Sequence, residues 1–203
     1  MSRGAGALAG VLAVAAALAA GCRERPDRRR EDGADGVEVA AQTSAPNRAA
    51  PVLGPDRFGP LDRTSRAERA ALTRAFPGLR VEPAAGRFRV SRGDAALFTV
   101  APADDGSVSS VEVVSGEVTT ALGARVGDRF EDLQRAAGPL ECNGGVDERA
   151  GEVLCSPRRA RNLVFIFPVS DRRYAGDDVP ADRQRGLLAG KRVHRIHWTP
   201  PGR

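Results

Sequence analysis

The stretch Gly127–Pro139, GDRFEDLQRAAGP, predicts a helix from which the rest of the fold can be predicted. Its apolar residues recur at helical spacing and would share one face of a helix, and its final Gly-Pro pair would stop that helix. These apolar residues are Phe130, Leu133, Ala136 and Ala137. Asp128 and Glu131 have the spacing of a capping box, which predicts that the helix begins there.

A second stretch with the same plan lies earlier in the chain, at Thr64–Gly78, TSRAERAALTRAFPG. Ser65 and Glu68 have the capping-box spacing, 63 residues before the equivalent pair. The apolar residues of its expected helix face are Ala67, Ala71, Leu72, Ala75 and Phe76. Pro77 and Gly78 would end this helix, so the sequence predicts two helices of similar design.

Three segments of strand character follow each expected helix, with tight turns such as SRGD between them. They are residues 87–90, 95–100 and 107–115 in the first half, and 152–155, 162–167 and 191–198 in the second. We therefore predict an α+β fold, with two tandem helix-plus-antiparallel-sheet units forming one globular domain over residues 58–199. The alternative is coincidence, because a helix followed by strands is common.

The N-terminus predicts export and a lipid anchor. Arg3 precedes an apolar run of 13 residues, Leu8–Ala20, which is the length of a signal-peptide core and too short to span a bilayer. The small residues before Cys22 resemble the bacterial lipobox, in which cleavage precedes a cysteine whose thiol is then lipidated. The alternatives are an ordinary signal peptide that leaves a free cysteine, and a retained transmembrane helix.

These features divide the chain into a signal peptide (1–21), a lipidated cysteine with a disordered tether (22–57), the domain (58–199) and a short tail (200–203). The tether is charged and lacks aromatic residues, so it cannot bury enough apolar surface to order itself. Several acyl chains on Cys22 would hold the protein firmly to a membrane. Arg23, by resemblance to the enterobacterial sorting rule, favours the outer membrane, with the domain facing the periplasm.

The chain has three cysteines. If Cys22 is lipidated, Cys142 and Cys155 remain and can form a disulfide, which an exported protein would keep in an oxidising compartment. The alternatives are two buried thiols or half of a metal site. Neither histidine is near these cysteines in sequence, and a zinc site needs four ligands at closer paired spacing, so we favour the disulfide.

Basic residues exceed acidic ones by five. In a cytosolic protein this excess would suggest nucleic acid as a partner, but the export signal argues against that class. The densest basic cluster of the domain comprises Arg158, Arg159 and Arg161, which are candidates for binding phosphate or carboxylate groups of an anionic glycan or an envelope protein. The plainer interpretation is a solvated hairpin loop.

No catalytic, metal or cofactor site is predicted. His194 and His197 are three residues apart on an expected strand, so they would point to opposite faces and could not chelate one ion. The acidic pairs Asp104–Asp105 and Asp177–Asp178 have no third ligand at useful spacing and are typical of turns. The spacings of common hydrolase and nucleotide-binding motifs are absent from the sequence.

Several stretches, in order, resemble a family. They are GPL (59–61), VSGEVTTALGARVGDRFEDL (114–133) with SVSSVEVV before it, the two domain cysteines, NLVFIF (162–167) and VHRIHW (193–198). Together they resemble an uncharacterised family of proteobacterial lipoproteins typified by YfeY. The chain departs from that family in its longer, arginine-rich tether. The resemblance implies an envelope lipoprotein and carries no established activity.

We therefore expect a non-catalytic protein, not an enzyme, that binds a protein partner, an envelope assembly or an anionic glycan. One rival is an envelope hydrolase with an unrecognised site around Tyr174 and the long excursion 168–190, because long loops often carry function. Another is a periplasmic enzyme inhibitor that holds its target on the concave face of the sheet.

Overall fold

A computed structural model describes residues 50–169 and 175–202. The chain divides into two units, of which Pro46–Arg203 contains all described elements. The predicted signal peptide and Cys22 lie outside the described residues, as does Tyr174. None of the helices in the described ranges is long and apolar enough to span a bilayer.

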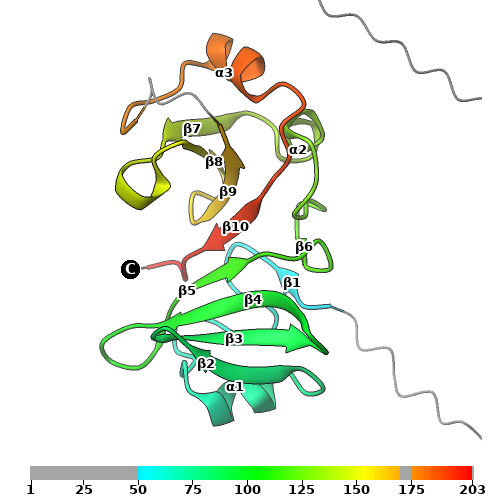
Figure 1. The fold of residues 1–203 in the computed structure, drawn as a ribbon, viewed down its shortest axis with the longest axis vertical. Coiled ribbons are helices and arrows are strands. Elements are labelled where there is room, and N and C mark those ends of the chain that lie inside the picture. The colour runs from blue at the N-terminus through cyan, green and yellow to red at the C-terminus, as the bar shows by residue number, and fades with distance from the viewer. Residues whose placement is uncertain (1–49, 170–174, 203) are drawn as a thin grey trace, which may run out of the picture. The chain divides into compact units, whose positions relative to one another are not determined.

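One eight-stranded antiparallel sheet forms the centre of this unit (Figure 1). Its strands run in the order β2-β3-β4-β5-β10-β9-β8-β7. The first-half strands are β2 (Arg80–Ala84), β3 (Arg87–Arg92), β4 (Ala95–Pro102) and β5 (Val108–Val113). The second-half strands are β7 (Leu140–Gly144), β8 (Glu152–Pro157), β9 (Leu163–Pro168) and β10 (Arg195–Trp198). The two halves join where β5 pairs with β10.

The tandem plan of an α+β fold is therefore confirmed, with two corrections to its details. Each half contributes four strands rather than three, because β2 and β7 precede the strands that the sequence predicted. The two sets of strands also form one continuous sheet, whereas we expected a small sheet in each half. The cause is the pairing of β5 with β10, in which Val111 lies opposite Trp198.

Three α-helices accompany the sheet: α1 (Arg69–Ala75), α2 (Phe130–Ala137) and α3 (Ala181–Leu188). A short 3-10 helix, η1 (Asp147–Arg149), lies in the loop between β7 and β8. The helix α3, which the sequence analysis did not predict, occupies the excursion before β10. Phe76, which caps α1, packs against Phe98 of β4, and Phe130 of α2 packs against Phe167 of β9. Each predicted helix thus contributes an aromatic contact to the sheet of its own half.

Neither predicted capping box forms. The helix α1 begins after Glu68, and α2 begins after Arg129, with no side-chain cap at either position. The Ser65 hydroxyl instead donates to Asp62 Oδ1 at 3.0 Å, within a turn that precedes α1. In the second half, Glu131 Oε1 accepts the backbone N–H of Gly190 at 2.9 Å. Ser65 therefore stabilises the turn before α1, and Glu131 holds the loop at Gly190 against α2.

The folded region begins before residue 58, which corrects the expected end of the tether. Strand β1 (Val52–Leu53) pairs in parallel with β6 (Thr119–Thr120), and Leu53 is fully buried. The carbonyl oxygen of Pro55 accepts hydrogen bonds from the Asn162 side chain at 2.6 Å and from the Trp198 indole at 3.3 Å. Residues 52–57 therefore contact both halves of the domain.

Candidate functional site

A groove of about 950 Å³ lies in the second half of the domain. Strands β7, β8 and β9 contribute its floor, the loop around η1 closes one end, and the start of α3 contributes a wall. Its principal lining side chains are Glu141, Asn143, Arg149, Leu154, Ser156, Arg158, Arg161, Val164, Asp178 and Gln184. The walls of this groove combine polar and apolar side chains, as ligand-binding sites do, so we take it as the candidate site.

The floor of the groove combines apolar and polar side chains because alternate residues of paired strands share one face. Leu154 of β8 lies opposite Asn143 of β7, and Ser156 lies opposite Glu141. Leu154 and Val164 are half-buried, while the residues on either side of each, such as Cys155, are buried on the other face. The floor therefore offers apolar contact next to hydrogen-bonding groups.

Two arginines converge on one carboxylate in the groove. Arg158 Nε lies 3.2 Å from Glu141 Oε1, and Arg161 Nη2 lies 3.1 Å from Glu141 Oε2. The two arginines come from the loop between β8 and β9, and Glu141 comes from β7. All three side chains remain substantially exposed, so these ion pairs contribute little to folding and stay open to exchange with a ligand.

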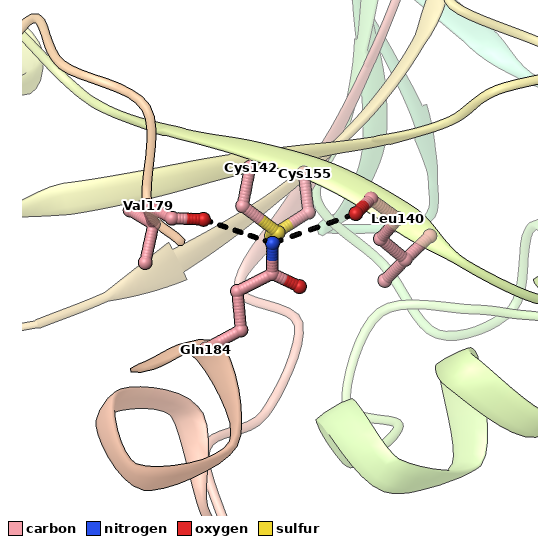
Figure 2. Close-up of a disulfide and its surroundings, with 5 residues drawn as sticks. All are labelled: Leu140, Cys142, Cys155, Val179 and Gln184. Atoms are coloured by element: carbon pink, nitrogen blue, oxygen red, sulfur yellow. Dashed lines mark hydrogen bonds between the residues drawn. A yellow bond between two sulfur atoms is a disulfide. The ribbon is translucent and has the colours of Figure 1, made fainter. Parts of the chain in front are cut away.

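Cys142, which lines the groove, forms a disulfide with the buried Cys155, as predicted (Figure 2). These residues lie directly opposite each other on β7 and β8. The side chain of Gln184, from α3, reaches toward the disulfide and donates to Val179 O at 3.0 Å and Leu140 O at 3.5 Å. Because Gln184 is buried, these bonds satisfy its amide nitrogen and hold α3 against the edge of the sheet.

The segment just before α3 closes the outer edge of β7. Gly144 N–H donates to Asp177 O at 2.9 Å, and Val179 N–H donates to Cys142 O at 2.7 Å. With the Asn143 amide turned so that its nitrogen faces Asp178, that nitrogen lies 2.9 Å from Asp178 Oδ1. These contacts cover backbone groups that an edge strand would otherwise expose for pairing with another chain. The edge of β7 is therefore covered, whereas the groove beside it remains accessible to a ligand.

A network of four charged side chains continues from the groove toward the first half of the sheet. Arg149, which lines the groove, lies 3.4 Å from Glu112 and 3.4 Å from Glu152. Arg195 pairs with the same two carboxylates, lying 3.2 Å from Glu112. Burial lowers the pKa of Arg195, but attraction to Glu112 and Glu152 outweighs that effect and raises its pKa overall. Arg195 therefore stays charged.

His197 lies beside this network, directly opposite Glu112 in the pairing of β10 with β5. Its pKa is lowered, first by burial and then by the positive charge of Arg149, while Glu112 acts in the opposite direction. Its Nδ1 atom is buried and has no hydrogen-bond partner among the residues described. The ring is therefore held in its neutral form beside four charged groups.

The sequence profile of a family described as "Protein of unknown function (DUF1131)" matches residues 86–199, which is more than half of the chain. The chain belongs to this family. The match spans β3 to β10 and so includes the groove, the disulfide and the charged network.

A solved structure supports the architecture. The chain is similar to the crystal structure of the uncharacterized protein YfeY from Escherichia coli, with a TM-score of 0.53 and 20% identity over 72% of this chain and 98% of that one. At this identity the likeness shows the fold alone. An extracellular protein containing an SCP domain, from Bacillus anthracis, has a TM-score of 0.33 and 14% identity over 70% of this chain and 44% of its own. No curated protein matches.

The structure brings three of the six site residues predicted from the sequence to one place. Arg158 and Arg161 line the groove, and Cys142 lies in its wall. Arg159, between the two lining arginines, is exposed and has no ion pair with any residue described. Cys22 lies outside the described residues.

The remaining candidates are separate from one another. His194 is exposed before β10, whereas His197 is half-buried within that strand. Asp104 and Asp105 lie in the turn between β4 and β5, where Asp105 Oδ1 accepts the Ser107 N–H at 2.9 Å. No group of three potential metal ligands occurs in residues 50–169 or 175–202.

Sequence reasoning missed the four-charge network entirely. Its members are Glu112, Arg149, Glu152 and Arg195, and the pairs span 3 to 83 positions in sequence. The one local signal was Glu112, a charged residue between the buried Val111 and Val113 on a strand with one face inward. That pattern identifies the exposed face but cannot identify the partners.

Proposed function

We propose that this DUF1131 protein is a lipoprotein, anchored through Cys22 in the outer membrane with its domain in the periplasm. We further propose that the domain is a non-catalytic binding module and that the groove beside the disulfide is its binding site. The observation that carries the proposal is this groove, whose floor offers apolar contact and whose walls present charged groups in fixed positions.

The anchor is supported by two features on separate parts of the chain. The lipobox-like stretch ends at Cys22, and the folded region starts about 30 residues later, near β1. The Cys142–Cys155 disulfide suits an oxidising compartment such as the periplasm. A folded domain on a charged tether could search the space around its anchor while remaining membrane-bound.

Binding, rather than catalysis, is supported by how the groove holds its charges. Arg158 and Arg161 are paired with Glu141, and Arg149 is paired with Glu112 and Glu152. Such pairs position hydrogen-bond donors and acceptors for recognition. The half-buried Leu154 and Val164 add an apolar surface for the rest of a ligand.

The anchor is tested by replacing Cys22 with serine in the full chain. We expect the C22S protein to move from the membrane fraction to the soluble periplasmic fraction. Mass spectrometry of the wild-type N-terminus should find acyl chains on Cys22. Unchanged membrane association of the variant would refute the anchor.

The groove is tested by hydrogen–deuterium exchange of the lipidated chain with and without purified peptidoglycan or outer-membrane vesicles. We expect one of these components to protect the amides of β7 and β8. The L154R variant, which places a charge on the groove floor, should lose that protection, whereas T99R, on the same sheet face in the first half, should keep it. Thermal unfolding of both variants checks that they fold. Protection confined to other elements would contradict the proposal.

A further inference from the structure

In the groove, the carboxylate of Glu141 lies between the guanidinium groups of Arg158 and Arg161. Arg161 Nη2 lies within 3.2 Å of both Glu141 oxygens, and Arg158 Nε lies 3.2 Å from Oε1. The arginine side chains are 71% and 73% exposed, and that of Glu141 is 39% exposed. A surface pair of this kind is weak, so exchanging one carboxylate for another anion costs little.

The two arginines are held on the same side of the sheet by the hairpin that carries them. Ala160 N–H donates to Pro157 O at 3.0 Å, and Leu163 N–H donates to Ala160 O at 3.0 Å. These bonds fix the backbone of the turn between β8 and β9, which carries both arginines within reach of Glu141. Guanidinium groups placed in this way suit the planar or tetrahedral oxygens of carboxylate and phosphate.

The other charges of the groove do not cancel this pair. Asp178 accepts a hydrogen bond from the Asn143 amide, and Arg149 is paired with Glu112 and Glu152. Glu141 is therefore the one carboxylate that neutralises Arg158 and Arg161 among the residues described. Removing its charge would leave two exposed guanidinium groups beside the apolar floor.

We infer that Glu141 is a built-in occupant of an anion site, and that a phosphate or carboxylate group of the ligand displaces it to bind Arg158 and Arg161. Leu154 and Val164 then contact the less polar part of the same ligand. This inference rests on the proposed binding function and names the ligand class as an anionic group on a partly apolar body. Competition from Glu141 keeps the empty site from holding small anions tightly.

The test is a titration of the folded chain with inorganic phosphate, followed through the Nε resonances of the arginines by NMR. We expect E141Q to bind phosphate about five- to tenfold more tightly than the wild type, with the largest shifts at Arg158 and Arg161. E117Q is the matched control, because Glu117 forms an exposed ion pair with Arg92 in the first half of the sheet. An equal affinity of E141Q and the wild type would overturn the inference.

A double variant tests which residues bind the anion, and two further probes test which kind of molecule supplies it. The double variant R158A/R161A should abolish the gain of E141Q without lowering its unfolding temperature. Vesicles of phosphatidylglycerol test a lipid phosphate, and acetate tests a carboxylate. If an envelope component protects β7 and β8 but E141Q gains no phosphate affinity, the inference fails and the binding function stands. If E141Q gains affinity but no component protects the groove, the anion site stands and the proposed function fails.

Discussion

Glu112 of β5 and Arg195 of β10 form an ion pair of 3.2 Å across the seam where the two halves of the sheet join. Each also bonds to a residue of the second half, because Arg149 reaches Glu112 and Arg195 reaches Glu152. The four side chains are between 14% and 30% exposed. The seam is therefore held by charges as well as by the buried pairing of Val111 with Trp198.

Replacing Glu112 with glutamine should destabilise the domain by about 1–3 kcal/mol. The variant leaves two partly buried guanidinium groups short of a partner, and such an unpaired charge costs more than the pair itself contributed. Urea unfolding measures the free energy of unfolding. E117Q, which breaks an exposed pair, should cost less than about 1 kcal/mol. Equal effects of the two variants would contradict this account of the seam.

Removing the disulfide should lower the free energy of unfolding by about 3 kcal/mol. The bond closes a loop of 13 residues between adjacent strands, and its loss frees the unfolded chain. The measurement is urea unfolding of the C142A/C155A protein beside the wild type with and without a reducing agent. Reduced wild type and variant should coincide. A reducing agent without effect on the wild type would show that Cys142 and Cys155 are not linked.

The stability of the domain should fall as the pH drops below 6.5, the ordinary pKa of histidine. Burial lowers the pKa of His197 in the folded state, so at pH 5 to 6 the unfolded chain takes up a proton that the folded chain does not. Acidification therefore favours unfolding. The H197N variant should lose part of this dependence, measured as the change in unfolding free energy between pH 8 and pH 5. Identical slopes for variant and wild type would refute the assignment.

Leu53 should contribute to folding although it lies in the expected tether. Because its side chain is fully buried, L53A should cost about 2–4 kcal/mol. Its neighbour Val52 is 51% exposed, so V52A should cost less than about 0.5 kcal/mol. Thermal unfolding distinguishes them. Similar unfolding temperatures for L53A and wild type would show that β1 is dispensable.

Local patterns predicted the elements whose apolar residues follow a clear period. Phe130 and Leu133 identified α2, and the alternation around Val111 and Val113 identified β5. Strands β2 and β7 were missed because Pro83 interrupts one and Gly144 ends the other, residues that weaken a strand pattern. The helix α3 was missed because Gly186 lies in its interior, where glycine is unfavourable.

Local sequence patterns could not predict which strands pair with each other or which distant residues meet. The pairing of β5 with β10 joins Val113 to Ile196, and nothing near either residue specifies its partner. The groove has the same origin, because Glu141, Arg158 and Gln184 come from three different elements. The arginine cluster could be predicted as a basic loop, but the carboxylate between two of its members could not.

The central proposal, that the groove binds a ligand in the cell envelope, is tested most directly by placing a photo-crosslinking residue at Ser156 in the full chain. Ser156 lies on the groove floor opposite Glu141. The control position is Arg89, exposed on β3 in the first half of the sheet. We predict one discrete adduct at position 156, identified by mass spectrometry as carrying an anionic group, and its absence at position 89. No adduct at position 156, or the same products at both positions, would contradict the claim.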